Sequence, residues 1–155
     1  MRKILAVGLV ALALAGCATV ETVPPLSVAE VVPIEGKSAS QLCHGARDWA
    51  ALTFRDSKSV IQVFDADRGQ MIGRGVMPVY VFGSPISVTF TMSVECKDGC
   101  IRASFNDYAT SYMGQDNPLV VEGPSRIQSQ AAARTKELIS SLGAHLRDSK
   151  KSDNW

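Results

Sequence analysis

The clearest pattern in the chain is the strict alternation of apolar and polar side chains from Ile86 to Cys96. A period of two places successive side chains on opposite faces of a β-strand, so this segment is predicted to be a half-buried strand. Asp98 and Gly99 follow it, and this pair favours the two-residue turn of a β-hairpin. We therefore predict a hairpin whose second strand begins at Cys100.

The turn also fixes the register of the hairpin, because it places Lys97 opposite Cys100. In this register apolar residues meet on one face, and Glu95 meets Arg102 on the other. A slip of one residue would move every side chain to the wrong face. Cys96 is therefore expected to point into the core and Cys100 away from it. The predicted apolar pairs are Cys96–Ile101, Val94–Ala103 and Met92–Phe105.

Two helices are predicted, each introduced by a capping box in which a serine and a glutamine satisfy each other's backbone amides. The first follows Ser38 and Gln41, carries a single apolar stripe and ends near Phe54. The second follows Ser125 and runs to about Arg147, with Gln128 completing its box. Its inward side chains are predicted to be Ala131, Thr135, Leu138, Ile139, Leu142 and Leu146.

Runs of β-branched and aromatic residues between turn residues predict the remaining strands. They are Val31–Ile34, Ser59–Asp65, Gln70–Val79 and a short strand at Pro118–Val121 within the long connection 109–124. Pro33 restricts the first of these to the edge or end of a sheet. Gly73 and Gly75 indicate a bulge or a close backbone approach. The elements together predict an α+β fold with about five antiparallel strands, two helices on one face and a polar opposite face.

The chain begins like a bacterial lipoprotein. Arg2 and Lys3 precede an apolar run of eleven residues from Ile4 to Leu14, whereas a membrane-spanning helix needs about 20. The run closes in Leu14-Ala15-Gly16-Cys17, which resembles the lipobox. The resemblance implies that residues 1–16 are a cleaved signal and that Cys17 carries lipid on a membrane facing an extracytoplasmic space. The alternative is an ordinary signal peptide followed by a chance cysteine.

The residues after Cys17 suggest a location and a spacing. Ala18, rather than Asp, follows the cysteine, a pattern that accompanies the outer membrane in Gram-negative lipoproteins. Residues 17–30 contain Thr, Pro and Ser without apolar periodicity, so we expect a lipidated tether. At roughly 3.1 Å per residue, it could hold the domain about 30 Å from the bilayer. The expected α+β domain is 31–148, followed by a polar tail at 149–155.

The charge of the chain argues against one class of partner. The chain has 16 basic and 15 acidic residues, and removal of Arg2 and Lys3 with the signal leaves the acidic residues in slight excess. Nucleic-acid binding depends on a basic patch or stripe, and the sequence shows no such cluster. We therefore expect no nucleic-acid partner, and membrane contact through the lipid on Cys17.

Three cysteines remain after Cys17, and an odd number leaves at least one unpaired in a monomer. A bridge between Cys96 and Cys100 is disfavoured because their side chains face opposite sides of the hairpin. A zinc site is an even less favoured interpretation, because it needs about four ligands. A Cys43–Cys96 disulfide remains open if the first helix covers the apolar face near the end of the hairpin. The alternative is two buried free thiols.

A series of short motifs resembles the bacterial domain of unknown function 4468. In chain order, the motifs are Trp49, Phe54, Lys58 to Gln62, Asp65, Gly69, Ile72 to Gly75, the alternating strand and Lys97-Asp98-Gly99. The resemblance covers roughly Val31 to Arg147. It implies a fold like that of the TATA-binding protein, with a curved antiparallel sheet backed by helices. It implies no activity, and fold alone does not indicate DNA binding.

Few side chains suggest chemistry. Cys43 and His44 are adjacent on a helix, so their side chains diverge and cannot form a nucleophile–base pair. His145 lies in the last turn of a predicted helix, where a cation is favoured. Asp65 and Asp67 flank a turn and are expected to shape it. We therefore predict no catalytic residue, cofactor or metal ion.

Four aromatic residues lie near predicted strand ends or in loops and could line a binding surface, because exposed aromatic side chains mark such sites. The alternative is that they pack in the core or within the loops. These residues are Tyr80, Phe82, Tyr108 and Tyr112. Gly73-Arg74-Gly75 lacks the length and context of a phosphate-binding loop, so a strand irregularity is favoured there.

Functions from different classes fit these patterns. The favoured one is a non-enzymatic binding or interaction module of the cell envelope. It would present its polar sheet face or the 109–124 connection to an envelope protein or to peptidoglycan. The competing one is a periplasmic hydrolase with no recognisable catalytic motif. A third is self-association through the sheet or an edge strand, giving a homo-oligomer.

Overall fold

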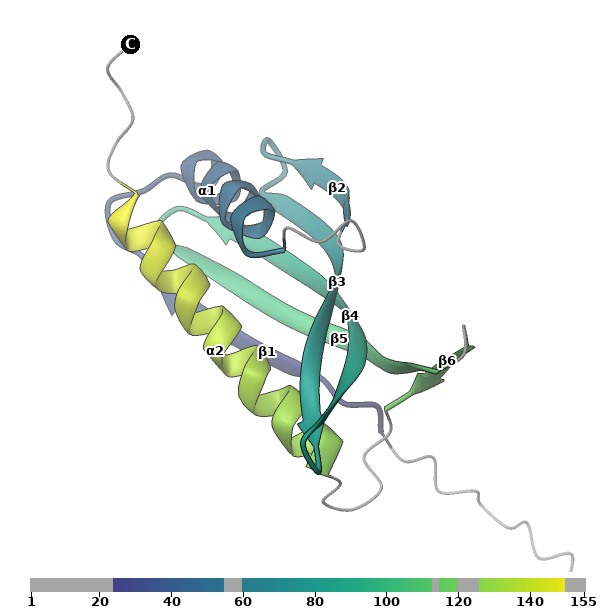
Figure 1. Ribbon diagram of the computed structural model, residues 1–155. Helices are drawn as coiled ribbons and strands as arrows, with labels where there is room; N and C mark the ends of the chain where they lie inside the picture. The colour runs from purple at the N-terminus through teal and green to yellow at the C-terminus, as the bar shows by residue number, and fades with distance from the viewer. Residues whose placement is uncertain (1–23, 55–59, 113–114, 120–125, 150–155) are drawn as a thin grey trace, which may run out of the picture.

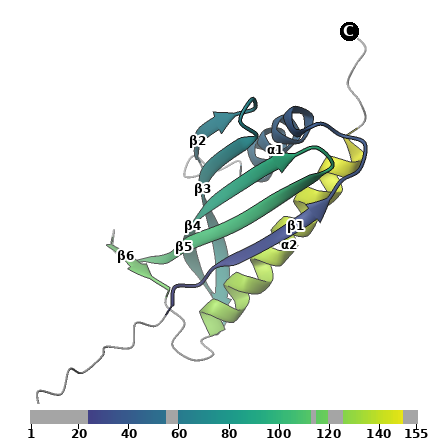
Figure 2. The same cartoon turned by 180° about the vertical axis from the view of Figure 1, so that it is seen from behind.

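The computed structural model describes residues 24–54, 60–112, 115–119 and 126–149. In chain order its elements are β1 (Val28–Pro33), α1 (Ala39–Thr53), β2 (Val60–Asp65), β3 (Gln70–Val81), β4 (Ser84–Lys97), β5 (Cys100–Tyr112), β6 (Gln115–Pro118) and α2 (Arg126–Asp148). The strands form one antiparallel sheet in the order β1-β5-β4-β3-β2, with β6 paired to β5 (Figure 1). Figure 2 shows the sheet from behind, with the helices on its far side. The predicted α+β class is confirmed.

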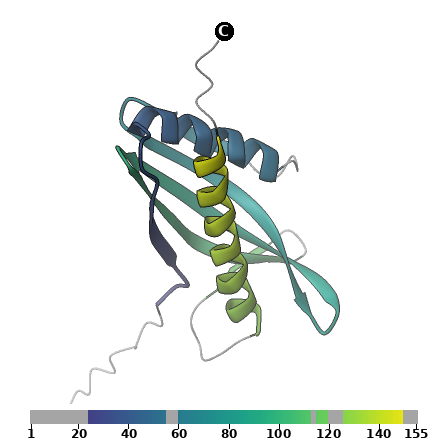
Figure 3. The ribbon, with the colours of Figure 1, turned by 90° about the vertical axis from the view of Figure 1, so that its left-hand side faces the viewer.

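Both helices lie on one face of the sheet and run across one another (Figure 3). Helix α1 buries Leu42, Ala46 and Trp49 from its apolar stripe. The whole predicted inward set of α2 is buried: Ala131, Thr135, Leu138, Ile139, Leu142 and Leu146. Because burial of apolar surface is the dominant favourable term in folding, this layer between sheet and helices is the core of the domain.

The hairpin formed by β4 and β5 has the register that the sequence predicts. Lys97 pairs with Cys100, and Glu95 pairs with Arg102. The alternate residues of β4 from Val88 to Cys96 are buried beneath the helices. Their neighbours on the opposite face are half-buried or exposed, and they are mostly polar: Thr89, Thr91, Ser93 and Glu95.

The irregularity predicted near Gly73 and Gly75 has two parts. A register shift occurs between Ile61 and Val63 of β2, directly opposite Gly73 in β3. At Gly75 the feature is a close approach, because an added Cβ would lie 2.5 Å from Cζ of Phe90 on the neighbouring strand. Only glycine leaves room for that ring.

Two strand boundaries correct the sequence prediction. Strand β1 begins at Val28 rather than Val31, because its backbone pairs with β5 from Phe105 onward. Backbone pairing does not require an apolar pattern of side chains. Residues 28–30 lack such a pattern, so the sequence analysis assigned them to the tether. The short strand predicted at 118–121 is instead β6, which pairs with residues 109–112 of β5. Its sequence, Gln115–Pro118, has none of the apolar alternation that reveals a strand.

The capping box of α1 is confirmed, with Ser38 accepting from the amide of Gln41 and the side chain of Gln41 accepting from that of Ser38. Ser125, which completes the predicted box of α2, lies outside the described residues. So do the predicted signal 1–16, Cys17, the tether up to residue 23, and the tail from residue 150. Pro33 is the last residue of β1, an edge strand, as predicted.

Candidate functional site

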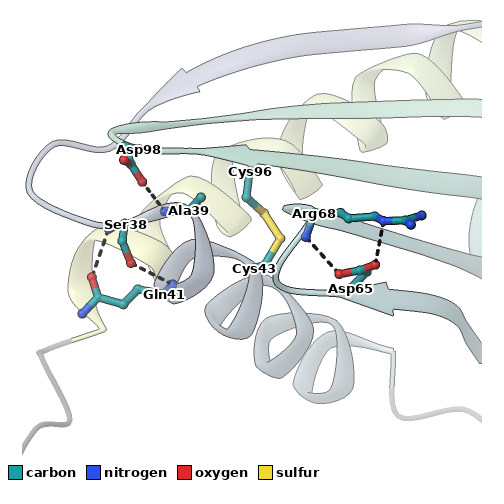
Figure 4. The surroundings of a disulfide bond; sticks show 8 residues. All are labelled: Ser38, Ala39, Gln41, Cys43, Asp65, Arg68, Cys96 and Asp98. Atoms are coloured by element: carbon teal, nitrogen blue, oxygen red, sulfur yellow. Dashed lines mark hydrogen bonds and ion pairs between the residues drawn. A yellow bond between two sulfur atoms is a disulfide. The ribbon is translucent and has the colours of Figure 1, made fainter.

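The end of the sheet beside the N-terminus of α1 is closed by a disulfide. Cys43 of α1 and Cys96 of β4 are bonded, with their Cα atoms 5.8 Å apart (Figure 4). Of the two arrangements that the sequence left open, the structure has the bridge. Cys43 belongs to the buried stripe of α1, and Cys96 is the inward residue that the hairpin register selects. Cys100 is free and half-buried.

Backbone and side-chain hydrogen bonds reinforce this end. Asp98, in the β4–β5 turn, accepts through Oδ1 from the amide of Ala39 at 2.7 Å, which fastens the turn to the start of α1 (Figure 4). The amide of Gly99 donates to the carbonyl of Lys37 at 3.0 Å. The ammonium of Lys37 donates to the carbonyls of Leu146 and Ser149 at the C-terminus of α2. Both helices are thus tied to one turn.

The β2–β3 turn joins the same end. Asp65 accepts from the amide of Arg68 at 2.9 Å and pairs with its guanidinium, so this carboxylate shapes the turn as predicted. The carbonyl of Gly69 accepts from the amide of Cys96 at 2.7 Å. Gly69 has φ of +66°, and a Cβ there would lie 2.4 Å from the carbonyl oxygen of Cys96. The turn therefore needs glycine for both conformation and space. Asp67 is exposed beside it.

An apolar pocket opens between the second half of α1 and strands β2 to β4. Its volume is about 300 Å³, at the lower end of the range for small-ligand sites. The lining residues are Ala50, Ala51 and Phe54 from the helix region, Ile61, Gly73, Arg74, Gly75, Phe90 and Met92. Phe54 packs edge-on against both Trp49 and Phe90 at 5.6 and 5.8 Å between ring centroids.

The pocket was not predicted as a site from the sequence. The feature of the sequence that indicates this pocket is the pair Gly73 and Gly75, which we interpreted above only as a bulge or a close backbone approach. Both glycines lie on the buried side of β3, where they alternate with exposed or half-buried residues. Small residues in a row of large buried side chains leave space above the sheet, and that is the feature that would have indicated a cavity.

The opposite end of the domain carries the tip of the β3–β4 hairpin. Phe82 in this tip is 86% exposed and Tyr80 is 57% exposed. The guanidinium of Arg126, at the start of α2, lies 4.9 Å from the centroid of the Phe82 ring. The amide side chain of Gln130 accepts from the backbone N–H of Tyr80 at 3.0 Å and donates to its carbonyl at 2.6 Å. These contacts fix the hairpin tip to α2.

Tyr108 is in the core and not in a binding surface. It is 2% exposed, and its hydroxyl lies 2.7 Å from that of Thr135. Thr135 donates to the carbonyl of Ala131, so Tyr108 donates to Thr135. Burial raises the pKa of Tyr108 to about 12. The side chain of Tyr112 lies outside the described residues.

The two histidines lie apart from the pocket. The His44 ring is exposed and contacts the Phe64 ring edge-on at 5.2 Å. His145 lies in the last turn of α2, as predicted. Among the residues that the structure describes, no three His, Cys, Asp or Glu side chains gather where they could hold a metal ion. Within the same ranges, no helix is long and apolar enough to cross a membrane.

The open antiparallel sheet with two helices on one face defines an α+β domain of the TBP-like class. Residues 29–110 match the model of a family described as a domain of unknown function (DUF4468) with TBP-like fold. The chain belongs to this family. A search of curated proteins finds no match.

Two solved structures have the same fold. A TBP-like protein from Parabacteroides distasonis is 10% identical, with a TM-score of 0.68 over 80% of this chain and 94% of its own. A DUF4468 family protein from Bacteroides ovatus is 14% identical, with a TM-score of 0.67 over 88% of this chain and 95% of its own. At these identities the likeness establishes the fold alone.

Proposed function

We propose that this protein is a lipid-anchored lipoprotein of the cell envelope and a non-enzymatic binding module. The anchor rests on the match of Leu14 to Cys17 with the lipobox. The proposed location is the outer membrane, facing the periplasm, and it is supported by Ala18 after the cysteine, the pattern that accompanies the outer membrane in Gram-negative lipoproteins. Multiple acyl chains on one cysteine give stable anchoring, whereas a single chain binds only marginally.

The structure shortens the proposed tether. Leu26 donates its backbone N–H to the carbonyl of Leu119, so the chain is already attached to the domain two residues before β1. Residues 18–23 separate Cys17 from the described chain, and six residues at roughly 3.1 Å each could span about 20 Å rather than the 30 Å expected above. Under this proposal the domain would lie close to the bilayer.

The apolar pocket is the observation that carries the binding function. Its lining is mostly apolar, with an aromatic floor at Phe90 and an aromatic wall at Phe54. Apolar lining of this kind favours an apolar side chain over the hydroxyl-rich surface of a glycan. Of the two partner classes considered, we therefore favour an envelope protein that inserts an apolar side chain, over peptidoglycan.

Two contacts bear on the hydrolase alternative. The carboxylate of Asp65 is engaged by the amide and the guanidinium of Arg68. The imidazole of His44 lies against Phe64. The residues that would have supported an acid or base role therefore make local structural contacts, and neither lines the pocket. These observations favour the binding function.

A photo-crosslinking residue at Ala51, an exposed residue that lines the pocket, tests this function in the native envelope. The matched control places the same residue at Thr91 on the opposite sheet face. We expect one defined protein to be attached at position 51 and not at 91, and Met92→Trp, which fills the pocket, to abolish the product. Attachment of peptidoglycan fragments, or a product that survives pocket filling, would contradict the proposal.

A further inference from the structure

The β3–β4 turn holds an unusual residue. Val81 pairs with Ser84, so Phe82 and Gly83 are the two central residues of the turn, and both have positive φ, 50° and 83°. Turns of this kind favour Asn-Gly or Gly-Gly, and a bulky residue with positive φ is uncommon. Phe82 is also 86% exposed. Neither turn preference nor burial accounts for a phenylalanine here.

The surroundings hold the tip in place and make it amphipathic. Arg126 stacks its guanidinium on the Phe82 ring. The side chain of Gln130 forms hydrogen bonds with the backbone N–H and carbonyl of Tyr80, as a neighbouring strand would. We define the tip patch as Tyr80, Phe82 and Arg126. It combines two exposed aromatic side chains of the hairpin with the guanidinium of Arg126 at the start of α2. Aromatic and basic side chains of this kind are enriched where proteins meet the headgroup region of a bilayer.

The position of the tip patch relative to the N-terminus is the second observation. The tip, the start of α2 and the start of β1 all lie at one end of the domain, and the C-terminal end of α2 lies at the other (Figure 1, Figure 3). The described chain begins at Pro24, and Cys17 precedes it by a short segment. A lipid on Cys17 would therefore hold this end of the domain toward the membrane.

We infer that the tip patch docks on the bilayer in which the protein is anchored, with the Phe82 ring in the interfacial region and Arg126 beside lipid phosphates. This inference rests on the proposed lipid anchor. The tether keeps the tip at a high effective concentration near the surface, so a contact that is weak by itself suffices to orient the domain. Docking would turn α1 and the apolar pocket beside it toward the periplasm.

The test uses the full acylated chain, reconstituted into phosphatidylethanolamine–phosphatidylglycerol vesicles whose acyl chains carry bromine, a quencher of tryptophan. Phe82→Trp places the probe in the tip. Leu52→Trp is the matched control, because Leu52 is 56% exposed on α1, away from the tip. The unsubstituted chain supplies the background from Trp49 and Trp155. We expect the Phe82→Trp emission to shift to the blue and to lose most of its intensity, and the Leu52→Trp emission to do neither.

The outcomes separate the two proposals. Acylated protein that floats with the vesicles while Phe82→Trp and Leu52→Trp are equally unquenched would overturn tip docking and leave the anchor intact. Protein that carries no acyl group on Cys17 and does not float would overturn the anchor, and tip docking would fall with it. As a second variant, Arg126→Glu is expected to reduce the quenching of Phe82→Trp, and unchanged quenching would remove Arg126 from the contact.

Discussion

The two ends of this domain are built in opposite ways. At one end, the disulfide and the Asp98 contact tie α1 to β4 and the β4–β5 turn, and Lys37 ties the C-terminus of α2 to the same turn. At the other, β3 and β4 extend as a hairpin beyond β2 and end in an exposed Phe82. We call these the disulfide end and the tip end. The difference suggests that the fold is secured at one end while the other is left available for contact.

The largest expected effect is loss of the disulfide. The bridge joins residues separated by 53 positions, and a loop of this length corresponds to about 4 kcal/mol of stability in the chain-entropy description. We expect Cys43→Ala with Cys96→Ala to lower the free energy of unfolding by about 2–5 kcal/mol, measured by urea denaturation. Cys100→Ala is the control and should change it little. An equal loss in both variants would show that the bridge does not secure this end.

The floor of the pocket should be the next most sensitive feature. Gly75→Ala forces a Cβ to within 2.5 Å of the Phe90 ring, and overpacking of this kind costs about 1–3 kcal/mol. We expect Gly75→Ala to be destabilising and Phe90→Leu to relieve part of the effect in the double variant. Urea denaturation of the four proteins measures this coupling. Strictly additive effects would mean that Phe90 does not rest on Gly75.

The buried hydroxyl pair gives an effect of similar size that also depends on pH. Thr135→Val leaves the Tyr108 hydroxyl without its acceptor and should cost about 1–3 kcal/mol. Because burial raises the pKa of Tyr108 to about 12 from the ordinary 10.0, the folded state favours the protonated phenol. Its contribution is complete below pH 10 and is lost as pH rises toward 12.

The matched control for this pH dependence is Tyr108→Phe, which has no titrating phenol at the site. Thermal unfolding followed at a series of alkaline pH values should show a steeper decline in the unsubstituted protein than in Tyr108→Phe above about pH 10. Parallel declines would contradict the raised pKa.

The smallest effect should have the opposite sign. Phe82→Asn places a residue suited to positive φ in the tip turn, and we expect the free energy of unfolding to rise by up to about 1 kcal/mol. Leu52→Asn removes another exposed apolar residue, but within a helix, and should not stabilise the protein. A gain in stability with a loss of membrane contact is the trade-off expected at a functional residue. Destabilisation by Phe82→Asn would show that the fold itself needs the phenylalanine.

The sequence predicted the disulfide end better than the tip end, for a physical reason. The β4–β5 register follows from strict alternation and a turn that tolerates no slip, and it fixes the inward direction of Cys96. The sequence left the pairing of Cys96 with Cys43 as one of two alternatives, because it depends on how α1 lies across the sheet. That placement is set by packing and by Asp98, which binds the amide of Ala39 across a long separation in sequence.

The tip end was less predictable because it is defined by backbone contacts. Strand β6 and residues 28–30 of β1 pair with β5 without an apolar pattern. The four aromatic residues could not be sorted by spacing alone. Phe82 and Tyr80 are exposed, whereas Tyr108 is in the core because β5 changes register between its pairings with Thr91 and Thr89 of β4. In the structure Asp107, next to this shift, has positive φ, and no feature of the sequence indicates the shift.

The central claim is that the tip end faces the membrane while the disulfide end stays exposed to the periplasm. Hydrogen exchange tests it most directly, on the acylated chain in vesicles and on the Cys17→Ser chain in buffer. The account predicts that backbone amides from Tyr80 to Ser84 exchange more slowly on the vesicles, while those around Cys43 and Cys96 are unchanged. Slower exchange at the disulfide end, with none at residues 80–84, would contradict it.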